Sequence, residues 1–97
     1  MLTPPGPAAI AVIRIAGPAV VPFLSQNFSR RAGPLRCVHG ELKDAGGAVI
    51  DDPVVVLSAD GGFADINLHG GPWLVASILE LLRQCGFTRI MDYTRHR

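Results

Sequence analysis

The clearest pattern in this sequence is an alternation of side-chain types over residues 63–69. One face of an extended chain here would carry Ala64, Ile66 and Leu68, and the other Phe63, Asp65, Asn67 and His69. A period of two is the side-chain period of a β-strand, so we expect a strand. Residues 10–16 predict a second strand, because isoleucine and valine pack well on a pleated sheet.

Two other segments have the apolar spacing of a helix. In residues 72–85 the apolar stripe consists of Leu74, Val75, Ile78, Leu79, Leu82 and Cys85. Gly86 follows and is suited to end a helix. Residues 19–28 predict a second helix, with Pro18 at a favourable first position. Pro22 would have to lie in its first turn, where the missing N–H costs little.

Residues 36–42 and 48–58 predict the two strands of a hairpin. The turn between them, residues 44–47, ends in two glycines, which permit the backbone angles of a tight turn. Pro53 interrupts the second strand and indicates a sheet edge or a bulge, because proline cannot donate to a ladder. A last short strand is expected at 88–91. Together these elements predict an α+β domain with two helices and a mixed, mainly antiparallel sheet.

The composition indicates a small packed protein. We expect one domain, residues 1–97, because 48% of the residues are hydrophobic and only 18% charged. The formal net charge of +1 supplies no broad basic surface, so direct nucleic-acid binding is not expected. We expect no membrane contact and a cytoplasmic location, since no apolar run could cross a bilayer and the start lacks signal-peptide character. Two cysteines without a CxxC spacing are typical of reduced thiols.

Arg14 calls for a partner, since it is charged in an otherwise apolar strand, and Asp65 lies on the polar face of its own strand. Spacing alone favours a structural interpretation: Arg14 extends to the sheet edge or pairs with a carboxylate such as Asp65. Cys37 and His39 share a strand face, but two ligands do not make a metal site, so we expect no metal and no catalytic residue. The glycines of residues 69–72 precede a helix without completing a P-loop, and ordinary capping explains them.

Several short motifs occur in the order seen in one known family. Residues 3–6 read T-P-P-G, residues 14–18 read R-I-A-G-P, and residues 68–72 read L-H-G-G-P. Between them, residues 50–57 read I-D-D-P-V-V-V-L. This series resembles the amino-terminal domain of the tRNA-modifying GTPases called TrmE or MnmE and spans most of the chain.

The resemblance implies a fold like the folate-binding domain of the glycine-cleavage T-protein. It also implies binding of 5-formyl-tetrahydrofolate or a related folate, with Arg14 and Asp65 as the cofactor-binding residues. A carboxylate suits that role, because it accepts paired hydrogen bonds from the amino group and ring nitrogen of a pterin. The family has a glutamate where this chain has Asp65, one methylene shorter.

Other departures from the family's motifs argue against binding of the family's ligands. The family's S-F-T-G-E-D loop is reduced here to about Asp60-Gly61-Gly62. After T-P-P-G, residues 7–9 read P-A-A in place of the family's basic-glycine-glycine run. No G-x-x-x-x-G-K-[ST] motif occurs, so we expect neither a GTPase domain nor GTP as cofactor. The family's first strand precedes T-P-P-G, and its loss would expose a sheet edge that often pairs with another chain, so a homodimer is expected.

Two functions remain open at this point. The first is a folate-binding and dimerisation module related to wobble-uridine modification of tRNA, with no GTPase activity of its own. Whether such a module is an enzyme by itself stays open. The alternative is a structural or protein-interaction remnant that has kept the fold and lost the ligand.

Overall fold

The computed structural model describes residues 10–68 and 72–95, so the T-P-P-G turn and His69–Gly71 lie outside the described residues. The elements in chain order are β1 (Ile10–Ala16), α1 (Val20–Asn27), β2 (Cys37–His39), β3 (Leu42–Lys43), β4 (Val49–Asp51), β5 (Val54–Leu57), β6 (Phe63–Leu68), α2 (Pro72–Gln84) and β7 (Ile90–Arg95). The expected α+β class, with two helices and a mainly antiparallel sheet, is confirmed. The last strand begins two residues later than expected and is longer.

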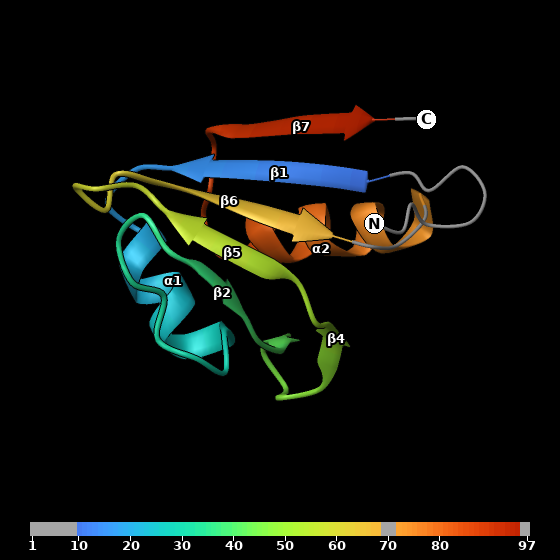
Figure 1. Cartoon of the computed structure of the whole chain (residues 1–97). Coiled ribbons are helices and arrows are strands. Elements are labelled where there is room, and N and C mark those ends of the chain that lie inside the picture. Colours follow the sequence, from blue (N-terminus) through green and yellow to red (C-terminus); the bar gives the residue numbers. More distant parts are fainter. Residues whose placement is uncertain (1–9, 69–71, 96–97) are drawn as a thin grey trace, which may run out of the picture.

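The main sheet has five strands in the order β2-β5-β6-β1-β7, and each neighbouring pair is antiparallel (Figure 1). β1 lies between β6 and β7, so segments that are far apart in the sequence lie side by side in the middle of the sheet. The two outer strands are β2 and β7, and within the described residues their outer edges pair with no further strand. These edges offer unpaired N–H and C=O groups of the kind that template pairing with another chain.

The predicted hairpin forms, but each of its two strands breaks in the middle. Gly40 separates β2 from β3, and Pro53 separates β4 from β5. The Gly40 N–H donates to the Pro53 carbonyl at 3.2 Å, which joins the two breaks. Proline cannot continue a ladder, and a Cβ on Gly40 would lie 2.9 Å from the buried ring of Phe28. The halves therefore separate: β2 and β5 stay in the main sheet, and β3 and β4 form their own two-stranded sheet.

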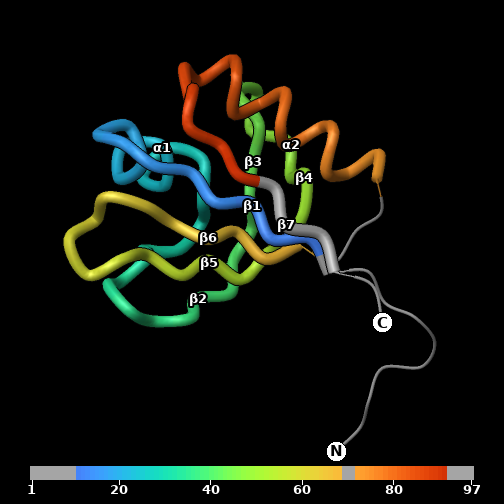
Figure 2. The backbone as a smooth tube through the Cα atoms, turned by 90° about the horizontal axis from the view of Figure 1, so that it is seen from above, coloured from blue at the N-terminus to red at the C-terminus, as the bar shows by residue number. Residues whose placement is uncertain are grey.

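The hydrophobic core lies on one face of the sheet, and both helices cover that face (Figure 2). The core contains Ala11, Ile13, Ile15, Val20, Phe23, Leu24, Phe28, Leu42, Val55, Leu57, Ala64, Ile66, Leu68, Leu74, Ile78, Leu81, Leu82 and Phe87. Rings of Phe23 in α1 and Phe87 after α2 meet edge to face with centroids 5.4 Å apart. The predicted stripe of α2 was wrong at its end: Cys85 is exposed and Leu81 is buried. Gly86 ends the helix with a positive φ of 91°, as expected.

The opposite face of the sheet is covered by neither helix and faces the viewer in Figure 1. Strand register places five residues in one row across it: Cys37, Val56, Asp65, Arg14 and Met91. We call this surface the open face. Val54, Val56 and the central Arg14–Asp65 ion pair are half-buried, whereas Met91 is exposed at the β7 side.

Candidate functional site

Arg14 and Asp65 form a two-pronged ion pair at the centre of the open face. They are directly opposite each other in the antiparallel ladder of β1 and β6, so strand register alone brings the side chains together. Arg14 Nε donates to Asp65 Oδ1 at 2.7 Å, and Arg14 Nη2 donates to Asp65 Oδ2 at 2.9 Å. This is the bidentate geometry that suits a planar guanidinium and a carboxylate. The structure thus unites the two residues that the resemblance named.

An aromatic ring supports the arginine from the side. The guanidinium carbon of Arg14 lies 4.1 Å from the centroid of the Phe63 ring, a cation–π contact. Sequence reasoning placed Phe63 on the same strand face as Asp65 but did not assign it to the site. The signal was the spacing: residues two apart on a strand project from the same face.

The position of Phe63 depends on the turn that precedes it. Ser58 Oγ accepts a hydrogen bond from the Phe63 N–H at 3.0 Å and donates to Asp60 Oδ1 at 2.9 Å. The same carboxylate oxygen accepts from the Gly62 N–H at 2.8 Å. The bond from Gly62, followed by that from Ser58, lowers the pKa of Asp60 from its ordinary value. The shortened loop is therefore a tight turn that closes the hairpin of β5 and β6 and sets the start of β6.

The ion pair is accessible enough to meet a ligand. The side chains of Arg14 and Asp65 are 37% and 24% exposed. Each carboxylate oxygen of Asp65 accepts one hydrogen bond from Arg14, and a carboxylate oxygen can accept more than one. An amino group or ring N–H of a ligand could therefore add to the carboxylate without first breaking the ion pair. The residues present fit the polar edge of a pterin in this respect.

Cys37 and His39 do lie together on the open face near its β2 edge, and both are exposed. His39 Nε2 is 3.3 Å from Asp52 Oδ2, a contact between side chains that are more than half exposed. No group of three potential metal-ligating side chains occurs among the described residues. Within that part of the chain, no helix has the length and apolar character needed to span a membrane.

Comparison with known proteins bears on the family. A family profile described as "GTP-binding protein TrmE N-terminus" matches residues 1–93. Among curated relatives, a tRNA modification GTPase MnmE of Akkermansia muciniphila is 36% identical over 94 residues, which cover 87% of this chain and 21% of the relative. The MnmE of Listeria innocua serovar 6a is 33% identical over 94 residues, with 87% and 21% covered. The MnmE of Ruegeria sp. (strain TM1040) is 28% identical over 99 residues, with 95% and 23% covered.

These matches agree with the series of motifs and with the observed fold. The chain spans about a fifth of the length of the curated relatives it matches. The alignment nevertheless covers nearly all of this chain and includes both strands that carry the ion pair. Its curated relatives include tRNA modification GTPases named MnmE, and this chain belongs to the TrmE amino-terminal family.

Proposed function

We propose that this chain is a tetrahydrofolate-binding and dimerisation module that serves tRNA modification and has no GTPase activity of its own. The observation that carries the proposal is the Arg14–Asp65 pair, half-exposed at the centre of a sheet face that neither helix covers. Family membership supports it, because the resemblance assigns folate contacts to these same two positions. A bound formyl-tetrahydrofolate would supply a one-carbon unit. Such a role would place the module in the cytoplasm.

Each residue of the pair has a distinct part in this proposal. Asp65 would accept hydrogen bonds from the amino and ring nitrogens of the pterin. Arg14 holds the Asp65 carboxylate in place through two bonds, and Phe63 holds the Arg14 guanidinium. Val56 lies beside Asp65 in the same row and would provide apolar contact for a flat ring. Because the described residues would enclose a ligand on the open face from one side only, a second copy would complete its enclosure.

Isothermal titration of the purified chain with 5-formyl-tetrahydrofolate tests the ligand. We expect micromolar binding that is lost in Asp65→Asn, a change that keeps the size of the side chain and removes its charge. Asp52→Asn is the matched control, because Asp52 is exposed and lies outside the pair. Binding that survives Asp65→Asn, or falls equally in both variants, would contradict the assignment of the site.

One observation favours the alternative, a structural or protein-interaction module without a ligand. The strongest donors and acceptors on the open face already satisfy each other at 2.7 and 2.9 Å. Light scattering with and without folate separates the two functions. A dimer in both conditions, together with no heat of folate binding, would favour the interaction module. A monomer in both would contradict the dimerisation part of the first proposal.

A further inference from the structure

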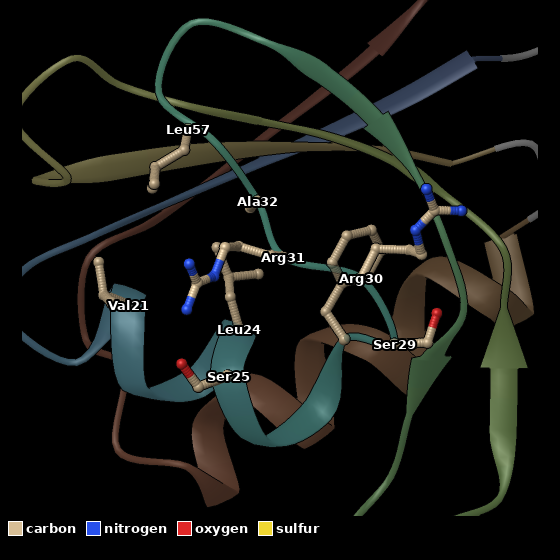
Figure 3. A pocket seen from close by; sticks show the side chains of 9 residues that line it. Val21, Leu24, Ser25, Ser29, Arg30, Arg31, Ala32 and Leu57 are labelled. Carbon is tan, nitrogen blue, oxygen red and sulfur yellow. The ribbon is translucent and has the colours of Figure 1, made fainter.

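A hollow lies on the side of the sheet opposite the open face, between α1, the segment that follows α1 and the end of β5 (Figure 3). Its volume is about 520 Å³, within the usual range of small-molecule pockets. Leu24, Phe28 and Leu57, all largely buried, form its apolar floor, the exposed Val21 forms an apolar rim, and Ser25, Ser29 and Arg31 add polar groups. Leu57 belongs to the core face of β5, whereas Arg14 and Asp65 project from the open face. The hollow is therefore separate from the ion pair.

The charged side chains that line the hollow are all positive. No carboxylate lines the hollow, and residues 29–36 contain three arginines and no acidic residue. In Figure 3 the Arg31 guanidinium lies toward Val21 and Ser25 of α1, whereas that of Arg30 points the other way. A Cβ added to Gly40 would lie only 2.7 Å from Arg30 Cγ, so the stem of Arg30 is close to that strand break. Among the described residues, Arg31 has neither an ion pair nor a side-chain hydrogen bond.

The segment that carries Arg31 is held in place at both ends. The Ser29 N–H donates to the Glu41 carbonyl at 2.8 Å, and the Leu35 N–H donates to the Leu57 carbonyl at 2.8 Å. Ser29 Oγ also accepts from the Glu41 N–H at 2.8 Å, which leaves its hydroxyl hydrogen to donate. Leu35 itself has a positive φ of 59°, an unfavourable conformation for leucine that the anchoring overcomes. The anchored backbone therefore fixes the place from which the exposed Arg31 side chain extends beside the hollow.

We propose that this hollow binds a small organic anion, with a phosphate or carboxylate group on a compact apolar body. The Arg31 guanidinium would bind the anionic group, with the hydroxyl group of Ser25, which lies on the same side of the hollow in Figure 3, as a further donor. The apolar body would pack on Val21 and on the exposed edges of Leu24, Phe28 and Leu57. The charge and the walls of the hollow together favour such an amphipathic anion over either a free inorganic ion or a neutral ring.

The probes are phenyl phosphate, phenylacetate, inorganic phosphate and benzyl alcohol, each titrated calorimetrically into the whole chain at constant ionic strength. We expect phenyl phosphate or phenylacetate to bind and the neutral alcohol not to bind. The aromatic anion that binds with the higher affinity shows whether the hollow prefers a phosphate or a carboxylate group. Inorganic phosphate should bind at least about tenfold more weakly than phenyl phosphate, because it cannot use the apolar walls.

Variants locate the binding. Arg31→Gln should weaken it about tenfold or more, the usual worth of a charge-assisted hydrogen bond. Arg36→Gln is the matched control, because it removes the same charge from the same segment outside the hollow, and it should leave affinity within about twofold. Ser25→Asp places a negative charge beside Arg31 on an exposed helix position and should abolish binding. Asp65→Asn should have no effect, which separates this proposal from that of folate binding.

Three results would overturn the proposal. The first is no heat with either aromatic anion. The second is equal weakening by Arg31→Gln and Arg36→Gln, which would indicate diffuse attraction to a basic segment. The third is inorganic phosphate that binds as tightly as phenyl phosphate, which would exclude a part for the apolar walls.

Discussion

Replacing Arg14 by alanine should lower the free energy of unfolding by about 1–2 kcal/mol and leave a folded protein. The ion pair with Asp65 is bidentate but part-exposed, 37% for Arg14 and 24% for Asp65, so water screens it. Pairs of this kind contribute about 0.5–1 kcal/mol, and the contact with the Phe63 ring adds about 0.5–1 kcal/mol. In a domain of this size the sum corresponds to a fall in Tm of roughly 4–16 °C.

Urea unfolding followed by far-ultraviolet circular dichroism measures this change. A double-mutant cycle with Arg14→Ala, Asp65→Ala and the double variant isolates the pair, and we expect a coupling energy of about 0.5–1 kcal/mol. Arg14→Ala should cost more than Asp65→Ala, because it also removes the cation–π contact with Phe63. Arg83→Ala is the matched control: its pair with Glu80 on α2 is longer, 3.3 Å, and more exposed, so the cost should stay below about 0.5 kcal/mol.

A coupling energy above about 3 kcal/mol would refute this reasoning, since it would mean a desolvated pair that folding requires. The pair would then be a structural requirement of the fold, and the interaction module would become the better proposal. A loss of cooperative unfolding in Arg14→Ala would have the same meaning. The cycle thus decides, before any ligand is added, whether folding requires the pair.

Three further predictions concern the turns that frame the sheet. Asp60 has a pKa lowered below 3.8, so its contribution to stability is complete above that pH and is lost as the pH falls through the lower folded pKa. Asp60→Asn should therefore flatten the fall in stability between about pH 5 and about pH 2 in urea titrations. Gly40→Ala should lower the free energy of unfolding by about 1–3 kcal/mol, because its Cβ would lie 2.9 Å from the buried Phe28 ring. Gly46→Ala is the control, since its Cβ has only an ordinary contact at 3.5 Å and the change should be close to neutral. Equal costs of the two substitutions in urea unfolding would contradict this prediction. Leu35→Gly should raise Tm, because glycine relieves the positive φ of an exposed leucine, and a lower Tm would show that Leu35 makes a stabilising contact.

Much of the fold could be read from local patterns. The alternation over residues 63–69 correctly identified the buried face of β6, and β1 has the bounds expected for it. The predicted hairpin was right in its turn and in the interruption at Pro53, and wrong in the continuity of its first strand, which breaks at Gly40. Proline and glycine signals at Pro53 and Gly40 mark where a ladder is interrupted, but they do not say that the two halves join different sheets. That outcome depends on Phe28, which packs where a side chain on Gly40 would lie.

The sequence by itself determined which residues are apolar on each strand, where the helices lie, and which family the chain belongs to. Those features are local or are carried by ordered motifs. The strand order was decided only by the tertiary structure, because it depends on contacts between residues far apart in the chain. Arg14 and Asp65 are 51 positions apart and meet only because β6 pairs with β1 in one register. A slip of one residue would send Asp65 into the core, so burial of Ala64, Ile66 and Leu68 on the helix side is the physical reason that the pair forms on the open face.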